Sequence, residues 1–275
     1  MVTIKTFGGL SNRMMAIASA EAMSRYFGQN LKIIWNPDAG LNSKFNSLFH
    51  PIPNLEFVSQ GFLTKTVINK FKKTLPYLFK KYLSFKYQRA LLYNDVEGIR
   101  QSYPDTRIFF NQYKSYTKIY IENCHIFYPL DKGFDIFKPL DHILHRIENV
   151  TREFNANTIG LHIRRTDNEY AIKHSPLFLF IKLIDEIILN NKNANFYLAT
   201  DDPAIFIELK SLYSNRILHF SKNKRRDIQI GIEEALIDLF SLSQTQKIYG
   251  SAGSTFSMVA AILGKKELEI IMNNN

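Results

Sequence analysis

The sequence contains a single cysteine, Cys124, among its 275 residues. One cysteine excludes an intramolecular disulfide and any zinc site built from several thiolates. Such sparing use of cysteine is typical of proteins kept in a reducing compartment, and we therefore predict a cytoplasmic location.

Long hydrophobic runs are also missing. The most apolar stretch, PLFLFIKLIDEIIL from Pro176, is interrupted by Lys182 and Asp185 and is too short to span a bilayer. The N-terminus, MVTIKTFGGL, has a strand-like start and an early Gly-Gly turn where a secretory signal carries a continuous apolar core. We expect a soluble protein that is at most peripheral to the inner face of a membrane.

Acidic residues are in deficit, with 25 Asp and Glu against 35 Lys and Arg, a formal net charge of +10. This excess predicts attraction to phosphates, nucleic acid or an acidic membrane surface without choosing between them. The sequence has no recognisable RNA- or DNA-binding motif. A non-catalytic nucleic-acid-binding protein is therefore the less favoured class, and we expect no nucleic-acid partner.

Residues 61–94 concentrate the positive charge. They hold eight Lys and Arg and no acidic residue, interleaved with Phe, Tyr and Leu at roughly helical spacing. A solvated basic face on packed helices is one interpretation, and it is the commoner origin of such charge runs. A surface for anionic lipid headgroups is the alternative.

The second half of the sequence alternates short apolar runs with helical patterns. Such alternation predicts a parallel sheet covered by helices on both faces. The dinucleotide fingerprint of three spaced glycines is absent. We predict strands in TIGLHI, NFYLAT, RILHF, KIYG and LEII, and helices at 177–189, 203–212, 229–242 and 255–263.

The first half also begins as α/β. We predict strands at 2–7, 30–35 and 54–59, with a turn at Gly8-Gly9 and a helix from about Ser11 to Tyr26 ending at Gly28. The fold class is therefore α/β, with two Rossmann-like lobes that face a cleft. We predict the lobes at 1–150, which includes the basic helical segment 61–94, and at 151–275.

Polar residues follow two predicted strands. HIRRTD, at 162–167, carries two arginines whose planar forks match phosphate oxygens, although two ion-paired arginines capping a sheet are the structural alternative. In YLATDDP, Asp202 is a natural N-cap with Pro203 at the first helical position. Asp201 is left to orient an arginine or a ligand hydroxyl.

A third segment, GIEEALIDLFSLSQTQKIYGSAGSTFSMVAA, spans 231–261. Its Asp238 is embedded in apolar helix residues and needs a partner. A carboxylate can accept two N–H bonds from a guanine edge. The loop from Ser251 to Thr255 supplies hydroxyls and amides at a helix start, where phosphate is favoured. Ordinary turn and capping chemistry is the simpler interpretation of that loop.

The order and spacing of three motifs carry a resemblance to a family. HIRRTD, YLATDDP, and LIDLFSLSQ running into GSTFSMVAA resemble the motifs of the GDP-fucose-dependent fucosyltransferases of the α1,6 type, including the nodulation-factor enzymes of rhizobia. The α1,2 and protein O-fucosyltransferases are more distantly similar. The likeness covers about 157–264, and GGLSNRMMAIASA resembles the family's glycine-containing entry loop. Residues 30–150 show no comparable match.

The resemblance implies a GT-B-like fold with an acceptor-side lobe at 1–150 and a GDP-sugar-binding lobe at 151–275. It implies an inverting, metal-independent transferase that moves fucose from GDP-fucose to a hydroxyl of a glycan acceptor, without a cofactor. The acceptor is expected to be a bacterial surface or lipid-linked oligosaccharide, which would bring peripheral contact with a membrane. A transferase that uses another GDP-sugar is the alternative.

The resemblance also assigns roles to residues. Arg164 matches the arginine that binds the donor β-phosphate and stabilises the departing GDP. His162 and Asp238 match positions that contact guanine. The other residues expected at the donor are Arg165, Asp201, Ser254 and Thr255 and, from the first lobe, Gly9, Asn12 and Arg13.

General-base catalysis requires a carboxylate near the acceptor hydroxyl. Glu169, in the predicted loop after HIRRTD, is the first candidate, and Asp167 is the second. The loop up to Pro176 departs in spacing from the family pattern. A solvated loop residue is therefore an equally open interpretation of Glu169.

Overall fold

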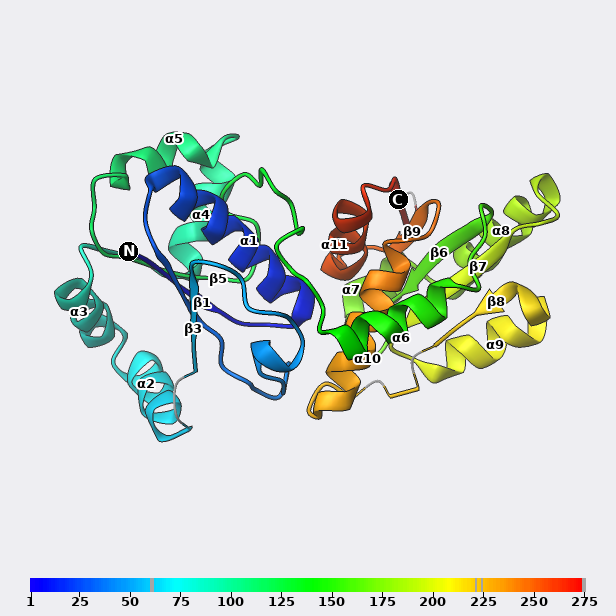
Figure 1. The fold of residues 1–275 in the computed structure, drawn as a ribbon, viewed down its shortest axis with the longest axis horizontal. Helices are drawn as coiled ribbons and strands as arrows, with labels where there is room; N and C mark the ends of the chain where they lie inside the picture. Colours follow the sequence, from blue (N-terminus) through cyan, green and yellow to red (C-terminus); the bar gives the residue numbers. More distant parts are fainter. Residues whose placement is uncertain (60–61, 221, 224, 274–275) are drawn as a thin grey trace. The chain divides into compact units, whose positions relative to one another are not determined.

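The computed structural model describes residues 1–59, 62–220, 222–223 and 225–273. The chain divides into two compact units, Met1–Lys138 and Pro139–Asn275 (Figure 1). The boundary predicted at 150 falls inside helix α6 (Asp141–Thr151), which packs against helix α10 (Gln229–Leu242) of the second unit. The division therefore lies before α6.

The first unit is built on a parallel sheet of five strands in the order β3-β2-β1-β5-β4. The three strands predicted in its sequence are confirmed as β1, β2 and β3, whereas β4 and β5 were not predicted. Its helices and strands are β1 (Val2–Thr6), α1 (Leu10–Phe27), β2 (Leu31–Ile34), β3 (Leu55–Val58), α2 (Phe62–Thr74), α3 (Pro76–Lys86), β4 (Arg89–Leu91), α4 (Tyr93–Ser102), α5 (Thr106–Phe110) and β5 (Ile119–Asn123).

Glycines fix both ends of α1. Gly8 has a φ of 81°, in the left-handed region that glycine enters without steric cost, and it allows the tight turn after β1. Gly28 ends the helix with a φ of 65°, and its N–H donates to the carbonyl of Arg25. The predicted strand, glycine turn and helix are confirmed.

The basic segment predicted at 61–94 contains α2 and α3, and residue 61 lies outside the described residues. One side of these helices packs on the sheet. Phe79, Leu83 and Tyr87 form an apolar cluster with Ile34 of β2 and Tyr120 of β5. The segment is therefore anchored to the unit by a buried face of its own.

The second unit contains a parallel sheet in the order β10-β9-β6-β7-β8. The predicted strands and helices are confirmed within a few residues, but the predicted loop after HIRRTD contains an additional helix, α7. The elements after α6 are β6 (Thr158–Ile163), α7 (Glu169–His174), α8 (Leu177–Asn190), β7 (Asn195–Thr200), α9 (Pro203–Tyr213), β8 (Ile217–Leu218), α10, β9 (Ile248–Ser251), α11 (Thr255–Gly264) and β10 (Leu268–Ile271).

Alternation along β6 sorts its side chains onto two faces. Ile159, Leu161 and Ile163 join the apolar cluster formed with α8 and α9. Gly160 faces the other side, where an added Cβ would lie 2.6 Å from both Leu242 and Thr245 at the end of α10. This strand therefore directs its even-numbered residues toward α10 and α11.

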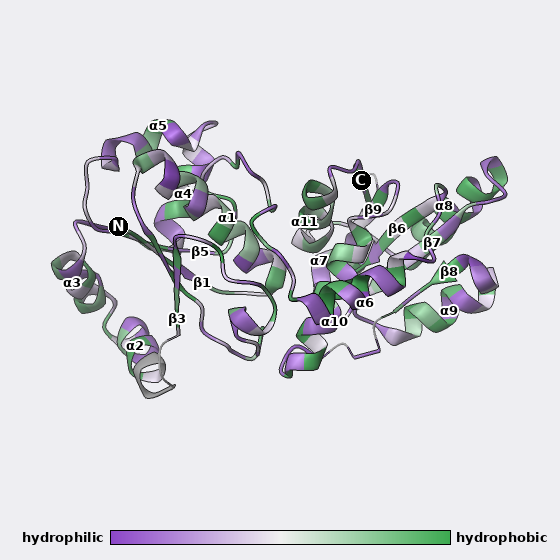
Figure 2. Cartoon of the chain, in the orientation of Figure 1, coloured by the Kyte–Doolittle hydropathy of each residue, from purple (hydrophilic) through white to green (hydrophobic). Residues whose placement is uncertain are grey.

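Hydrophilic and hydrophobic residues are interspersed along the outer helices, as α3 and α8 show in Figure 2. Within the described ranges, no helix combines the length and the apolar character needed to cross a membrane. The predicted α/β class with two Rossmann-like units is confirmed.

Candidate functional site

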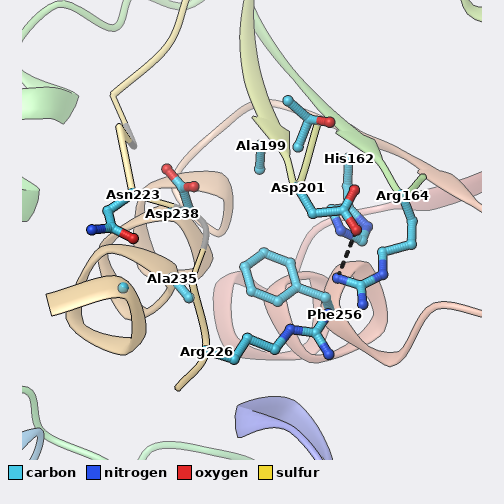
Figure 3. Close-up of a pocket in the computed structure, with 11 residues that line it drawn as sticks. His162, Arg164, Ala199, Asp201, Asn223, Arg226, Ala235, Asp238 and Phe256 are labelled. Carbon is cyan, nitrogen blue, oxygen red and sulfur yellow. Dashed lines mark ion pairs between the residues drawn. The ribbon is translucent and has the colours of Figure 1, made fainter. Parts of the chain in front are cut away.

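A pocket lies at the carboxyl ends of β6 and β7 in the second unit (Figure 3). Open parallel sheets bind ligands at this edge. The pocket holds about 460 Å³, including space open to solvent, within the range of about 300–1,000 Å³ for small-molecule sites. Its lining residues are His162, Arg164, Ala199, Thr200, Asp201, Asn223, Arg226, Gly231, Ala235, Asp238 and Phe256.

Strand geometry brings four of these residues together. The two-residue period of β6 puts His162 and the following Arg164 on the side opposite Ile163. The register pairs His162 with Ala199 of β7, so Ala199 and Asp201 share that side. The sequence pattern of two neighbouring strands thus builds one wall of the pocket.

Arg164 is fixed at this wall by two carboxylates. Its Nη1 lies 3.1 Å from Oδ2 of Asp201, the pair drawn as a dashed line in Figure 3, and its Nη2 pairs with Asp167. Its backbone N–H donates to Oγ of Ser251 at 3.1 Å. The Arg164 side chain remains 17% exposed, so the guanidinium is held in place and still reaches the pocket.

A second arginine, Arg226, lines the same pocket, and its Nη1 lies 3.1 Å from Oδ2 of Asp167. Asp167 therefore joins two arginines, and its side chain is 55% exposed. An anion with several oxygens can replace such an exposed carboxylate as the partner of both guanidinium groups. Arg226 was not predicted as a site residue, although the adjacent pair Arg225-Arg226 repeats the two arginines of HIRRTD.

Asp201 organises the turn after β6. Its Oδ1 accepts the N–H of Arg165 at 2.7 Å, and its Oδ2 accepts the hydroxyl of Thr166 at 2.6 Å. Burial alone would raise the pKa of Asp201, but the charge of Arg164 and these hydrogen bonds outweigh it and lower the pKa. The carboxylate thus stays charged and orients Arg164, while a direct contact with a ligand stays a prediction.

Arg165 points elsewhere. Its Nη1 donates to the carbonyl of Arg164 at 2.8 Å, and its Nη2 donates to the carbonyl of Ser175 at 2.7 Å. It is not among the residues that line the pocket. These bonds to the backbone give Arg165 a structural role, and they lend no support to the donor contact that the sequence predicted.

His162 is a buried lining residue whose ring stacks on Phe256 of α11, with 4.8 Å between centroids. Burial and the nearby charge of Arg164 lower the pKa of His162 to about 3. Its Nδ1 is buried without a hydrogen-bond partner in the described part of the chain. Near neutral pH the imidazole is therefore uncharged, and it offers a polar atom rather than a charge.

Asp238 has the partner that its burial requires. The hydroxyl of Tyr197 donates to Oδ1 of Asp238 at 2.7 Å, and both residues are buried. Burial, together with the charge of Asp238, raises the pKa of Tyr197, so its hydroxyl keeps its proton. Tyr197 was not assigned from the sequence, although its place two residues before Ala199 puts it on the pocket side of β7.

Ser254 and Thr255 lie at the start of α11. Ser254 occupies the N-cap position, and its side chain makes no capping hydrogen bond. Neither residue lines the pocket, whereas the next residue, Phe256, does. The phosphate contact predicted for this helix start therefore stays a prediction.

The two carboxylates predicted as general bases occupy different surroundings. Glu169 is exposed and begins α7, directly after the N-cap Asn168, whose Oδ1 accepts the N–H of Ala171 at 3.0 Å. The predicted loop position of Glu169 is therefore wrong, since the residue is helical. Asp167 has one oxygen paired with each of two arginines. Neither residue lines the pocket.

Arg13 belongs to the first unit and is fully buried there. Its Nε donates to the carbonyl of Gly8 at 2.9 Å, and its Nη1 donates to the carbonyl of Asn36 at 2.7 Å. Its Nη2 pairs with Asp38 at 2.7 Å. Because all three guanidinium nitrogens bind within this unit, Arg13 has a structural role, and its predicted contact with a donor gains no support.

The other two predicted residues of the first unit lie at the same turn. Gly9 is the N-cap of α1 and has extended backbone. Nδ2 of Asn12 donates to the carbonyl of Cys124 at 3.2 Å. Both residues lie at the carboxyl edge of the first sheet, where a ligand contact stays a prediction.

Comparison with solved structures finds relatives in fold. NodZ α-1,6-fucosyltransferase from Bradyrhizobium, co-crystallised with GDP, has a TM-score of 0.61 at 17% identity, covering 95% of this chain and 92% of that chain. A variant of FUT1 from Arabidopsis thaliana in complex with GDP has a TM-score of 0.62 at 17% identity, covering 100% and 70%. POFUT1 in complex with GDP-fucose has a TM-score of 0.55 at 9% identity, covering 98% of both chains.

No protein-family model matches the sequence. No curated protein is significantly similar to it. At these low identities the solved structures establish the fold alone. They confirm the resemblance to fucosyltransferases, and the GT-B-like class, that the three motifs indicated.

Proposed function

We propose that the protein is a fucosyltransferase that moves fucose from GDP-fucose to a hydroxyl of a glycan acceptor. One observation carries the proposal: Arg164 and Asp238, from distant motifs, line one pocket of a fold that this chain shares with fucosyltransferases. Relatives in fold were solved with GDP or GDP-fucose bound. An arginine fork suits the diphosphate of a nucleotide, and a buried carboxylate in the same pocket can accept N–H groups of its base.

The lining residues divide the pocket chemically. Asp238 is buried and oriented by Tyr197, and it provides a carboxylate that can accept N–H groups of guanine. Phe256 contributes an aromatic surface, and Arg164 and Arg226 contribute positive charge. We therefore place the base toward Asp238 and the diphosphate toward the two arginines.

The proposed reaction is a single displacement with inversion. The acceptor oxygen forms a bond to C1 of fucose while the bond between C1 and the β-phosphate oxygen breaks, and GDP leaves with that electron pair. Negative charge grows on the leaving diphosphate, where fixed guanidinium groups stabilise it most effectively. Arg164, held in place by Asp201, is the residue that we assign to this role.

The acceptor hydroxyl must lose its proton as it attacks. Glu169 is our first candidate for the base, because its exposed carboxylate lies shortly after Arg164 in the chain. Asp167 is second, since both of its oxygens already pair with arginines. The variant Glu169→Gln distinguishes the two candidates. If Glu169 is the base, this variant transfers fucose to the acceptor more slowly but binds GDP as tightly as the wild type.

Metal independence is part of the proposal, because two arginines can neutralise a diphosphate without a cation. Within the described ranges, no group of three or more His, Cys, Asp or Glu side chains is arranged to hold a metal ion. Transfer is expected to continue at an unchanged rate in excess EDTA. A rate that falls in EDTA and returns with magnesium or manganese would contradict this part of the proposal.

The acceptor that we propose is a bacterial surface or lipid-linked oligosaccharide modified in the cytoplasm. The support is the low cysteine content and the basic segment of the first unit. Incubation with GDP-fucose and an array of such oligosaccharides, with products read by mass spectrometry, tests acceptor and activity together. The anomeric configuration of the product, read by NMR, tests inversion.

Two alternatives have distinct outcomes. Arg164 and Asp238 are proposed to contact the nucleotide and not the sugar, so they do not distinguish one GDP-sugar from another. If the protein transfers mannose from GDP-mannose in preference to fucose from GDP-fucose, the proposed donor is wrong but the proposed reaction class still holds. Titration calorimetry with GDP, ADP and a single-stranded oligonucleotide tests the pocket itself. GDP binding in preference to ADP supports the proposal, whereas salt-sensitive oligonucleotide binding without GDP binding would replace it with nucleic-acid binding.

A further inference from the structure

The outer side of α2 and α3 carries a concentration of exposed apolar side chains. Single exposed apolar residues are normal, but a cluster of large ones marks an interaction surface. Phe85 is 94% exposed, so its ring makes almost no contact with its own unit. The exposed apolar residues of the segment are Val67 (65%), Leu75 (48%), Tyr77 (76%), Leu78 (44%), Tyr82 (47%) and Phe85 (94%).

These residues are not the packed face of the helices. Leu78, Tyr82 and Phe85 are spaced by four and three residues, which puts them on one stripe of α3. Phe79 and Leu83 form a separate stripe that is 2% and 3% exposed and packs on the sheet. Helix α3 therefore has two apolar stripes, of which one is buried against its own unit and the other is exposed.

Positive charge is exposed on both helices. Lys70, Lys73, Lys81 and Lys86 are exposed, and no ion pair in the described part of the chain involves any of them. The segment 61–94 contains no acidic residue that could neutralise them. Two other lysines of the segment do find partners, Lys72 with Glu122 at 2.5 Å and Lys80 with Asp95 at 3.9 Å.

Large apolar and tyrosine side chains together with lysines that form no ion pair are the composition of helices that lie in a membrane interface. The apolar residues enter the acyl boundary, and the lysines meet anionic headgroups. At 11 residues α3 is too short to span a bilayer. Nucleic acid would contact the lysines and the aromatic rings, but it would leave Leu75 and Leu78 without an apolar partner.

We propose that the outer surface of α2 and α3 binds the headgroup and acyl boundary of an anionic phospholipid bilayer. The surface consists of the exposed apolar residues Leu75, Leu78, Tyr82 and Phe85 and the lysines Lys70, Lys73, Lys81 and Lys86. The first interpretation of the basic segment, a solvated face, accounts for the lysines but not for Phe85. Lipid binding needs no nucleotide, so this proposal stands or fails independently of the fucosyltransferase activity.

Co-sedimentation with vesicles tests the surface. The full chain is expected to bind vesicles of phosphatidylcholine mixed with phosphatidylglycerol, to bind phosphatidylcholine alone weakly, and to dissociate in high salt. The double variant Leu78→Ser/Phe85→Ser should bind at least about tenfold more weakly, because two apolar side chains no longer enter the interface. The matched control, Leu189→Ser/Ile207→Ser, removes exposed apolar residues of the second unit (72% and 67% exposed) and should bind like the wild type.

The lysines have their own matched pair of variants. Lys81→Gln and Lys86→Gln should each weaken binding to the anionic vesicles about fivefold. Lys182→Gln, an exposed lysine of the second unit, should leave it unchanged. An unchanged melting temperature in every variant confirms that the substitutions leave the fold intact.

A tryptophan in place of Phe85 reports insertion. Phe85→Trp fluorescence should shift to the blue with anionic vesicles, while the buried Trp35 contributes a constant background. The proposal is overturned if the full chain binds no vesicles, or if the Leu78 and Phe85 variant and its control lose binding equally. If the chain binds no vesicles but self-associates, and Leu78→Ser/Phe85→Ser abolishes the self-association, the surface binds a second copy of the chain. If the chain instead binds an oligonucleotide and the same double variant abolishes that binding, the surface binds nucleic acid.

Discussion

Nη1 of Arg164 lies 3.1 Å from Oδ2 of Asp201, at the point where β6 and β7 end beside each other. The same carboxylate holds the backbone of the turn that follows β6. The orientation of the arginine is therefore set by the neighbouring strand before any ligand binds. A donor group that is already oriented needs no reorganisation when charge develops next to it.

Arg164→Ala should lower the turnover of GDP-fucose on the order of 10²–10³-fold, because the leaving diphosphate loses a fixed guanidinium. Arg164→Lys keeps a charge but loses the planar fork, so we expect an intermediate rate. The measurement is initial transfer rate at saturating donor, with melting temperature as a check on folding.

Arg225→Ala is the matched control for this substitution. Arg225 is also an arginine beside the pocket segment, but its side chain is 66% exposed and pairs with Asp227. The Arg225→Ala variant should therefore transfer fucose at the wild-type rate. Near-normal turnover by Arg164→Ala would remove Arg164 from the mechanism.

Asp201→Asn should slow transfer less than Arg164→Ala does, since it loosens the arginine without removing it. Its effect on stability depends on pH. The folded-state pKa of Asp201 is lowered, so its contribution to stability is fully present above the ordinary carboxyl pKa of about 3.9 and is lost as the pH falls below it. Urea denaturation should therefore show that the free energy of unfolding falls less between about pH 5 and about pH 3 in the variant than in the wild type. Parallel declines would mean that folding does not lower the pKa of Asp201.

His162 also makes the protein less stable as the pH falls, but for a different reason, because it is a base that burial keeps neutral. Its pKa is about 3 when folded, against about 6.5 when unfolded. The unfolded chain thus binds the extra proton first, and stability falls as the pH drops from about 6.5 toward 3. At about pH 5 the loss is about 2 kcal/mol.

His162→Phe should remove this pH dependence. Denaturation at about pH 7 and about pH 5 gives the two free energies, and this window lies above the titration of Asp201. The decline in the wild type should exceed that of the variant by about 2 kcal/mol. Equal declines would show that the imidazole is protonated within the fold.

The sequence was sufficient for the parts of the site that follow from local periodicity. The apolar run TIGLHI predicted the strand that carries His162, with Arg164 directly after it. The Asp202-Pro203 pair predicted where α9 begins, and Asp202 does accept the N–H of Ala204. These features depend on residues close together in the chain.

Residues brought in by distant contacts could not be predicted. Arg226 and Asn223 reach the pocket because Glu234 of α10 accepts the backbone N–H groups of Lys222 and Asn223 at 2.8 and 2.6 Å. No short pattern records that long-range restraint. The ion pair of Arg13 could not be predicted either, since its partner Asp38 lies in a remote loop.

The missed strand β5 shows a third cause. It is buried along its whole length, yet it contains Glu122. That charge interrupts the apolar pattern by which strands are recognised. It is tolerated because Lys72 of α2 pairs with it at 2.5 Å, a contact that only the fold supplies.

Asp238→Asn should reduce the preference for GDP over ADP by about tenfold to a hundredfold, because the charged acceptor for guanine N–H groups is lost. The matched control is Asp185→Asn. Asp185 also accepts a tyrosine hydroxyl, that of Tyr213 at 2.9 Å, but it lies outside the pocket. Calorimetry with both nucleotides gives the preference. A preference unaltered in Asp238→Asn would place base recognition elsewhere.

Gly231 makes the pocket wall at the start of α10 sensitive to a single methyl group. A Cβ at this position would overlap the carbonyl of Arg225, so Gly231→Ala must displace the backbone next to Arg226. We expect GDP affinity to fall about tenfold, because Arg226 loses its position, whereas the core of the unit keeps its packing.

Gly98→Ala is the control, since Gly98 is also within a helix and an added Cβ there meets no atom within 4 Å. That control should bind GDP like the wild type and be more stable by up to about 1 kcal/mol. Equal GDP affinity in the two variants would show that the contact between Arg225 and Gly231 does not shape the pocket.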